Sequence, residues 1–416
     1  MSLRIDVIAW AKNATRIGTP VLAQSCRYGS CIYRTMAFRA FGVISETCID
    51  VSKMAAGTVD IHAQVGSLAL DQIMVPSSRG RYMRKFFGAA GSVSRLVIKS
   101  EVLGTNILGD PTSRAVDVYI PAGHDGRGLP LLVDLVGITS SGLSHTNWMA
   151  FVENMPERLD RLIGEGRMPP VVVAFPDCFT RIGGNQYVNS AATGPWEDFL
   201  IVEMLPAIEG RFGCGGSGRR GVFGKSSGGY GAIMNALRHS DVWAAAACHS
   251  GDMGFELCYL ADMPATLRAL APNNSIEQWW CKLEEAKKRP DGVFTAMNIL
   301  AMAASYDPDP AVFLGMRLPV TFDTCEVIPD RWANWMRHDP VVAVEPLGNN
   351  LRSLKALYID CGERDQFNLL YGARRFVRRL NELGIAHRYE EFADNHSGVD
   401  YRMDESLPFL AAALGS

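Results

Sequence analysis

The sequence of 416 residues has no apolar run as long as the 18 or so residues that a membrane-spanning helix needs. It also has no marked excess of charge, because 41 Lys and Arg residues stand against 44 Asp and Glu residues and give a formal net charge of −3. Domains that bind nucleic acids usually carry a strongly basic patch. These two absences argue against a membrane span and against nucleic acid as the main partner.

Paired cysteine motifs are also missing. Ten cysteines are spread along the chain, and none forms the Cys-x-x-Cys pair found in zinc sites and thioredoxin-like sites. Cys248 and Cys361 lie in apolar, strand-like runs, where cysteine usually acts as a small buried hydrophobe. Because unpaired thiols in this number suit a reducing compartment, we expect a cytoplasmic protein.

Apolar residues are plentiful: 48% of the chain is hydrophobic and 20% is charged, enough for a large packed core. Residues 1–82 differ from the rest. The first 45 residues hold six Lys and Arg residues and one acid, Asp6, as organelle presequences do. The region has no sustained period of 2 or 3.6 and no strand pattern. We expect residues 1–82 to be a non-catalytic extension, with a targeting segment or a small domain as the alternatives, and residues 83–416 to form the main domain.

From about residue 94 the pattern is regular. Residues 94–104 and 113–123 alternate polar and apolar side chains, as half-buried strands do. Later apolar runs lack this alternation, which is typical of strands buried on both faces of a parallel sheet. These runs occupy 129–137, 169–177, 221–224, 243–251 and 354–362, followed by 387–392. Helical segments at 197–211, 227–239, 371–384 and 404–414 lie between them and predict an α/β fold, with a mostly parallel central sheet and helices on both faces.

The spacing of these elements breaks once, between the runs at 243–251 and 354–362. Residues 252–350 are rich in Met, Trp and Leu and predict a largely helical insertion that caps the site. The insertion contains four tryptophans that either line a pocket or pack its own core: Trp279, Trp280, Trp332 and Trp335.

A turn-forming segment carries the clearest chemical signal. Gly224-Lys225-Ser226-Ser227-Gly228 has the pattern Gly-x-Ser-x-Gly between an apolar strand-like run and a run of helical composition. In this context the central serine sits on a sharp strand-to-helix turn with its hydroxyl exposed, and larger side chains in place of the glycines would collide with the neighbouring strand and helix. Ser226 is therefore the candidate nucleophile, with a plain structural turn as the alternative. A P-loop is excluded by register, since Arg219 stands where its first glycine belongs.

A nucleophilic serine needs a histidine as base and an acid that orients the histidine. Where the serine sits on such a turn, the acid and then the histidine follow along the chain. Asp365 lies past the turn at Gly362, after the run at 354–362, and His396 follows the last strand-like run. The order of the segments therefore predicts a triad of Ser226, Asp365 and His396.

Hydrolysis also needs backbone N–H donors for the developing oxyanion. Ser227 follows the nucleophile directly, and Ile138 lies in the loop after the apolar run at 129–137, so we expect their N–H groups to form the oxyanion hole. Trp148 and Tyr230 are candidates for substrate binding, although helix packing explains them equally well. This chemistry requires no metal and no organic cofactor.

Four segments carry a family resemblance: GKSSGGYGA around Ser226, VGITSSG around Ile138, CGERDQFN around Asp365 and DNHS around His396. Together they resemble the putative-esterase branch of the α/β-hydrolase superfamily, which includes esterase D and the enterochelin esterases. The resemblance extends from about Ser94 to the C-terminus and implies an α/β-hydrolase fold for residues 83–416. The family triad corresponds to Ser226, Asp365 and His396, and its oxyanion donors to Ile138 and Ser227. The long insertion distinguishes this chain from the compact esterase D proteins.

The resulting prediction is a serine esterase that hydrolyses a small-molecule carboxylic ester through an acyl-enzyme. An acyltransferase with the same triad, a peptidase or amidase, and a non-catalytic binding module on a hydrolase scaffold are the alternatives. Product analysis with an acceptor alcohol separates the first of these from a hydrolase, and a panel of amides tests the second. A missing triad residue would favour the third, but all three are present. The sequence identifies neither the natural ester nor the oligomeric state.

Overall fold

We describe the protein from a computed structural model, which covers residues 23–28, 31–40, 43–50, 90–273 and 275–415. The chain divides into two compact units, Met1–Arg79 and Gly80–Ser416. In the first unit, β1 (Ala23–Tyr28), β2 (Cys31–Ala40) and β3 (Val43–Asp50) form an antiparallel sheet in that order.

The expectation that residues 1–82 have no strand pattern is therefore wrong. The strand β2 has the sequence CIYRTMAFRA, in which Ile, Tyr, Thr and Phe favour extended structure. Its apolar residues do not alternate strictly with polar ones, so a search for a period of 2 misses it. The non-catalytic role of this region stays a prediction.

The second unit contains an eight-stranded sheet in the order β13-β12-β11-β10-β6-β7-β5-β4. Its strands are β4 (Ser92–Lys99), β5 (Ser113–Ile120), β6 (Leu131–Leu135), β7 (Val172–Pro176), β10 (Arg220–Lys225), β11 (Ala245–His249), β12 (Ala356–Gly362) and β13 (Arg388–Phe392). The strands from β13 to β7 pair in parallel, whereas β5 is antiparallel to both of its neighbours. Each strand matches a run that the sequence marks as extended, and the predicted α/β fold with a mostly parallel sheet is confirmed.

The strand order reverses direction between β6 and β10. After β6 the chain adds β7 on one side, and it then returns to add β10, β11, β12 and β13 on the other side. At such a switch point the loops that follow the two central strands diverge and leave a crevice at the carboxyl edge of the sheet. The loop that follows β6 and the turn that follows β10 both open into this crevice.

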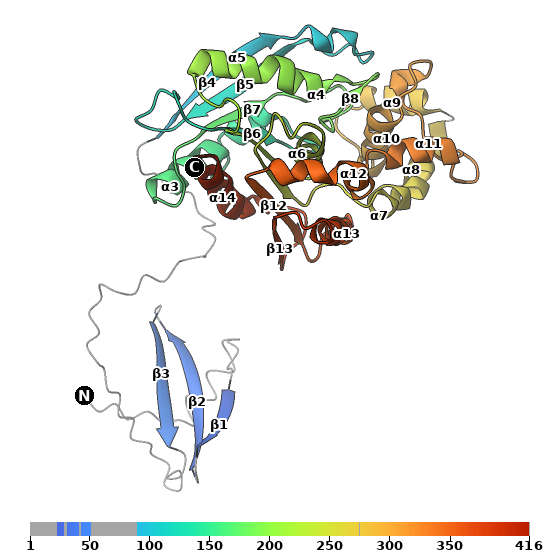
Figure 1. Cartoon of the computed structure of the whole chain (residues 1–416). Coiled ribbons are helices and arrows are strands. Elements are labelled where there is room, and N and C mark those ends of the chain that lie inside the picture. Colours follow the sequence, from blue (N-terminus) through green and yellow to red (C-terminus); the bar gives the residue numbers. More distant parts are fainter. Residues whose placement is uncertain (1–22, 29–30, 41–42, 51–89, 274, 416) are drawn as a thin grey trace. The chain divides into compact units, whose positions relative to one another are not determined.

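Helices cover both faces of the sheet (Figure 1). On one face, α3 (Met155–Gly164) and α14 (Met403–Gly415) share a buried apolar cluster with the sheet. On the other face, α5 (Leu205–Phe212), α6 (Ser227–Arg238) and α13 (Leu369–Glu382) belong to a larger cluster.

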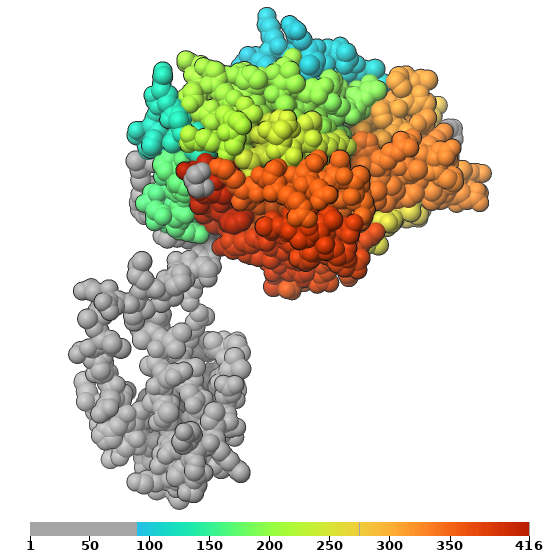
Figure 2. All heavy atoms as spheres, in the orientation of Figure 1, coloured from blue at the N-terminus to red at the C-terminus, as the bar shows by residue number. Residues whose placement is uncertain are grey.

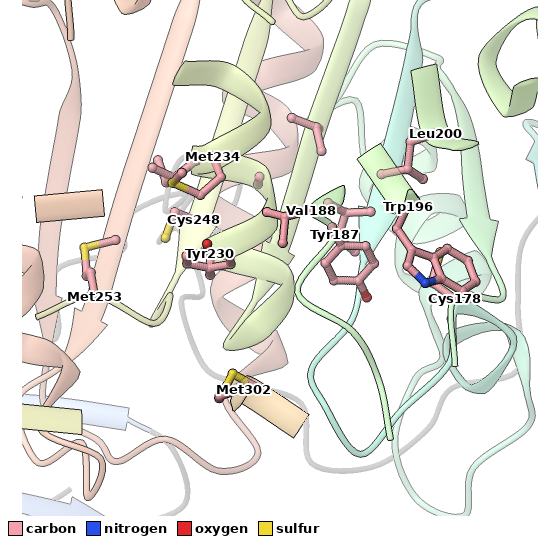
Figure 3. Packing of buried hydrophobic residues seen from close by; sticks show 14 of the residues in the cluster. Cys178, Tyr187, Val188, Trp196, Leu200, Tyr230, Met234, Cys248, Met253 and Met302 are labelled. Carbon is pink, nitrogen blue, oxygen red and sulfur yellow. The ribbon is translucent and has the colours of Figure 1, made fainter. Parts of the chain in front are cut away.

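 Figure 3 shows part of this larger cluster, which includes Tyr230 and Met234 of α6 together with Tyr187 and Val188.

The predicted insertion is helical. Between β11 and β12 the chain forms α7 (Phe255–Cys258), α8 (Met263–Leu270), α9 (Ile276–Glu285), α10 (Phe294–Tyr306), α11 (Pro329–Met336) and α12 (Pro340–Leu347). The helices α7 to α11 gather at one end of the sheet (Figure 1), and their atoms form a continuous surface with the C-terminal residues (Figure 2). The helix α12 instead packs against α6 and α13 and so belongs with the layer that covers the sheet.

The four tryptophans of the insertion pack within it. Trp279, Trp280 and Trp335 are buried, and Trp332 packs against the same apolar cluster. The insertion therefore has a core of its own that is continuous with the core of the sheet. Among the residues with a described position, no helix is both long and apolar enough to cross a membrane.

Candidate active site

Ser226 occupies the turn between β10 and α6 with a φ of 58° and a ψ of −127°. A positive φ is unusual for a residue with a side chain and costs about 1–3 kcal/mol. The turn is held by two hydrogen bonds: the Ser226 N–H donates to His249 O at 3.0 Å, and Tyr230 N–H donates to Ser226 O at 2.9 Å. The strained backbone leaves the Ser226 side chain half-buried at the edge of a pocket.

The glycines on either side of Ser226 are required by the close approach of β6. A Cβ atom on Gly224 or on Gly228 would fall inside contact distance of the Leu135 carbonyl oxygen, which is rigid backbone of the neighbouring strand. No side chain fits at either position without moving the central strands. The Gly-x-Ser-x-Gly pattern is therefore explained by the packing of this turn.

Asp365 and His396 come together in the loops that follow β12 and β13. His396 Nδ1 lies 2.8 Å from Asp365 Oδ2, and the Asp365 side chain is fully buried. The other carboxylate oxygen of Asp365 accepts a hydrogen bond from Phe367 N–H at 2.9 Å. The Phe367 ring also meets the His396 ring edge to face, with 4.9 Å between the ring centroids. These contacts fix both the carboxylate and the imidazole.

A pocket of about 550 Å³ joins these groups at the switch point of the sheet. Ser226, Ser227, Ile138 and His396 all line it, although they come from three separate regions of the chain. The insertion contributes six further lining residues: Asp252, Cys258, Tyr259, Arg289, Phe294 and Asn298. Other lining residues are His145, Lys225, Phe367, Leu369 and Asp400.

The loop after β6 is held in place by the segment 183–187. Gly184 N–H donates to Ile138 O at 2.5 Å, and a Cβ atom on Gly184 would lie 2.9 Å from Ile138 Cα. The Tyr187 hydroxyl accepts a hydrogen bond from Val136 N–H at 2.8 Å and donates to Val136 O at 2.7 Å. The residues on both sides of Gly137 are thus held in place by backbone hydrogen bonds, with Gly137 itself next to Ser226.

Ser227 takes part in a buried network of polar side chains. Its hydroxyl accepts a hydrogen bond from Gln186 Nε2 at 2.7 Å and donates to Asp252 Oδ2 at 3.2 Å. Asp252 also accepts a hydrogen bond from the Tyr259 hydroxyl at 2.8 Å. Burial raises the pKa of the Asp252 carboxyl, although the hydrogen bonds from Tyr259 and Ser227 oppose that effect. The backbone N–H of Ser227 lies in the first turn of α6, where helical N–H groups have no acceptor within the helix.

A second histidine–aspartate pair lies at the same pocket. His145 of α2 (Gly142–Thr146) has its Nδ1 atom 2.6 Å from Oδ2 of Asp134, which belongs to β6. The nearby Lys225 Nζ atom lies 3.8 Å from Asp400 Oδ1. Charged groups therefore occur at this pocket in addition to the predicted triad.

The lining of this pocket does not include Trp148 or Tyr230, and their role in substrate binding stays a prediction. The Trp148 side chain is 66% exposed, because it lies on the surface after α2. Tyr230 is fully buried among Phe255 and Tyr306, since it belongs to the inward side of α6. Helix packing, the alternative that the sequence leaves open, explains Tyr230 but not the exposed Trp148.

Four residues near the pocket are absent from the sequence-based prediction: His145, Tyr187, Gln186 and Asp252. Each is hydrogen-bonded to a partner that lies far from it in the sequence, so no short motif marks it. The segment GGNQYVNS at 183–190 gives the one visible signal, because paired glycines before polar residues indicate a close backbone approach.

The chain is similar to several solved structures. A ferulic acid esterase is 19% identical to this chain, with a TM-score of 0.50 and an alignment that covers 78% of this chain and 100% of the esterase. A fluorophosphonate-binding serine hydrolase of Staphylococcus aureus, FphF, is 16% identical, with a TM-score of 0.49 and coverage of 79% and 99%. An S-formylglutathione hydrolase from Agrobacterium tumefaciens is 18% identical, with a TM-score of 0.47 and coverage of 79% and 97%.

At these identities the structural likeness concerns the fold alone. A search of curated proteins finds no match to this chain. A family model described as "Putative esterase" matches residues 111–404, which include the turn at Ser226 and the pair of Asp365 and His396. The chain therefore belongs to this esterase family of the α/β-hydrolase superfamily and is a carboxylic ester hydrolase.

Proposed function

We propose that the protein hydrolyses its ester through an acyl-enzyme on Ser226. His396 takes the proton of Ser226 Oγ while this oxygen bonds to the ester carbonyl carbon. The tetrahedral intermediate then collapses, the bond to the alcohol oxygen breaks, and the alcohol leaves with the proton from His396. A water molecule then attacks the acyl carbon while it gives a proton to His396. The bond from the acyl carbon to Ser226 Oγ breaks, His396 returns the proton to this oxygen, and the carboxylic acid leaves.

One observation carries this proposal: the half-buried hydroxyl of Ser226 and the imidazole of His396 line one pocket, and Asp365 holds His396 Nδ1 at 2.8 Å. With Nδ1 occupied by a buried carboxylate, Nε2 is the nitrogen that remains for proton transfer. The carboxylate also stabilises the imidazolium that forms when the proton moves. Asp365 thus orients His396 and does not itself take up the proton.

The oxyanion is assigned to the N–H groups of Ile138 and Ser227. Each such donor typically lowers the barrier by about 2.7–4 kcal/mol. The hydrogen bond from Gly184 N–H to Ile138 O supports this assignment, because it holds the Ile138 backbone beside the nucleophile. For Ser227 the support is its place at the start of α6, where the helix dipole also favours negative charge.

The pocket supports a small-molecule ester as substrate. Its volume of about 550 Å³ lies within the roughly 300–1,000 Å³ typical of small-molecule sites. Phe294 and Phe367, whose ring centroids are 6.3 Å apart, and Leu369 give part of the lining an apolar character that suits a hydrocarbon portion of the ester.

The test is hydrolysis of p-nitrophenyl esters from acetate to laurate by the wild type and by Ser226→Ala. We expect the wild type to turn over a subset of acyl lengths that fits the pocket, and Ser226→Ala to lose at least about 1,000-fold in kcat. Ser217→Ala is the matched control, since Ser217 is exposed and lies before β10, at the opposite end of the strand from Ser226. Full activity of Ser226→Ala would refute the proposed nucleophile.

A further inference from the structure

The pair of His145 and Asp134 is not used by the proposed mechanism. Asp134 lies on the central strand β6 with a side chain that is 0% exposed, and His145 Nδ1 lies 2.6 Å from its Oδ2 atom. Within the described residues, the other carboxylate oxygen of Asp134 has no hydrogen-bond partner. A buried carboxylate is unfavourable unless a charged group offsets it. His145 is the group in position to do so.

The surroundings favour the protonated form of His145. Burial by itself would lower the pKa of His145, but the Asp134 carboxylate on β6 outweighs burial, so the pKa is raised above its usual value. Asp400 at the start of η8 (Asp400–Arg402) adds to the increase, and Lys225 at the end of β10 opposes it. His145 therefore carries a positive charge over a wider pH range than an ordinary histidine.

The orientation of the ring leaves one donor for a ligand. Asp134 occupies Nδ1, so Nε2 is the nitrogen that remains, and within the described residues it has no hydrogen-bond partner. The His145 side chain is 24% exposed, and the residue lines the pocket together with Ser226. An imidazolium N–H at a substrate pocket binds most strongly to an anionic oxygen.

The other charges of the pocket agree with an anionic ligand. Arg289 lines the pocket and, within the described residues, has no ion-pair partner. The Asp400 carboxylate lies 3.8 Å from the Lys225 ammonium. Asp252 is buried and accepts hydrogen bonds from Tyr259 and Ser227. The cations at His145 and Arg289 are thus the charged groups of the lining that remain for a ligand.

We propose that His145, held by Asp134, is a substrate-binding residue that donates from Nε2 to a carboxylate on the ester, so that the preferred substrates are esters with a carboxylate in their acyl or alcohol part. The proposal rests on the proposed function. His145 contacts the substrate, and Asp134 is a positioning residue that acts through it.

The experiment compares matched esters that differ in one charge. Mono-4-nitrophenyl adipate and 4-nitrophenyl 6-methylheptanoate test a carboxylate in the acyl part. In the alcohol part, 4-acetoxybenzoate and 4-methylphenyl acetate form the corresponding pair. The value of kcat/KM is measured for the wild type, His145→Gln, Asp134→Asn and the control Ser217→Ala, after subtraction of spontaneous hydrolysis.

We expect the wild type to prefer the carboxylated ester in at least one pair, and His145→Gln to reduce that preference at least tenfold, mainly through KM. Asp134→Asn should reduce it in the same direction. In the wild type the preference should fall as the pH rises through the pKa of His145, and His145→Gln should lack this pH dependence. Circular dichroism verifies that each variant is folded, and if Asp134→Asn fails to fold, His145→Gln alone decides.

An unchanged preference in His145→Gln for both pairs would overturn the proposal, as would an equal fall in kcat on all four esters, which would instead make His145 part of the reacting machinery. Absence of any preference in the wild type would also overturn it. Ser226→Ala separates the two proposals. If Ser226→Ala keeps its activity, the proposed function fails. If Ser226→Ala loses its activity and His145→Gln keeps the preference of the wild type for carboxylated esters, only the role of His145 is refuted.

Discussion

At the scale of single residues, the turn at Ser226 depends on two neighbouring glycines that have no side chain. Gly224 and Gly228 face the Leu135 carbonyl oxygen so closely that neither position has room for a Cβ atom. Ser226 itself holds a φ of 58°, a strained value that packing on both sides keeps in place. The strain and the missing side chains together expose one hydroxyl at the end of a central strand.

Gly224→Ala should destabilise the protein by more than about 3 kcal/mol, because the new methyl group collides with backbone and overpacking of this kind is costly. Gly210→Ala is the control, since Gly210 lies inside α5 with nothing within 4 Å of its Cβ position. That change should stabilise the protein by about 0.5–1 kcal/mol through helix propensity. Urea unfolding measures the stability of both variants. Equal stabilities would show that β6 leaves room for a side chain at position 224.

Asp365→Asn should reduce kcat by about 10,000-fold, the loss known for the equivalent change in a serine protease triad, because the amide favours the wrong imidazole tautomer. Thermal unfolding should show that the variant is folded. Asp394→Asn provides the comparison, since Asp394 lies two residues from His396 but bonds to Asn395 N–H and the Tyr401 hydroxyl. If both variants lose activity equally, Asp365 has no special role in orienting His396.

At the scale of elements, a cluster of charges joins α3 to α14 across one face of the sheet. Asp404 of α14 accepts hydrogen bonds from Arg158 and Arg161 of α3, and the Arg161 contacts are 3.0 Å long. Burial alone would raise the pKa of Asp404, but the two guanidinium groups outweigh it and hold the pKa below its usual value. The contribution of this carboxylate to stability is present above its unfolded pKa of about 3.9 and is lost as the pH falls through the lower folded pKa.

Asp404→Asn should lower the free energy of unfolding by about 1–3 kcal/mol at pH 7, because it leaves the Arg158 guanidinium without its carboxylate and removes one of the carboxylates that pair with Arg161. The difference from the wild type should shrink as the pH falls below about 4. Urea unfolding at pH 7 and near pH 3 measures it. A difference that stays constant over this range would contradict the assigned role of Asp404.

The elements differ in how well the sequence predicts them. The eight strands of the large sheet are predictable because polar–apolar alternation, continuous apolar runs and turn residues mark them, and the loops after β12 and β13 then place Asp365 and His396 in sequence order. The pairing of His145 with Asp134 depends on how α2 lies over β6, which no local pattern encodes. The strands β1 to β3 were missed because their residues favour extension without a strict period.

At the scale of the whole molecule, the site draws on distant segments of one unit. The switch point between β6 and β10 supplies the crevice, the loops after β12 and β13 supply the acid and the base, and the insertion supplies part of the pocket wall. All of these segments lie within Gly80–Ser416, and every residue that lines the pocket belongs to that unit.

A chain that begins at Met83 should therefore keep kcat/KM on p-nitrophenyl esters within about twofold of the full-length value, because it retains every residue of the pocket and of the large sheet. Steady-state kinetics of the two chains, prepared in parallel, measure the ratio. A folded but inactive shorter chain would show that residues 1–82 contribute to catalysis and would contradict the predicted non-catalytic role.

The most direct measurement for the central claim is the mass of the covalent adduct formed with a fluorophosphonate reagent, followed by peptide mapping. We predict a single adduct on the peptide that contains Ser226, no adduct in Ser226→Ala, and slower labelling in His396→Gln, because the hydroxyl then lacks its base. An adduct on another residue, or labelling that Ser226→Ala leaves unchanged, would contradict the account of Ser226 as the nucleophile.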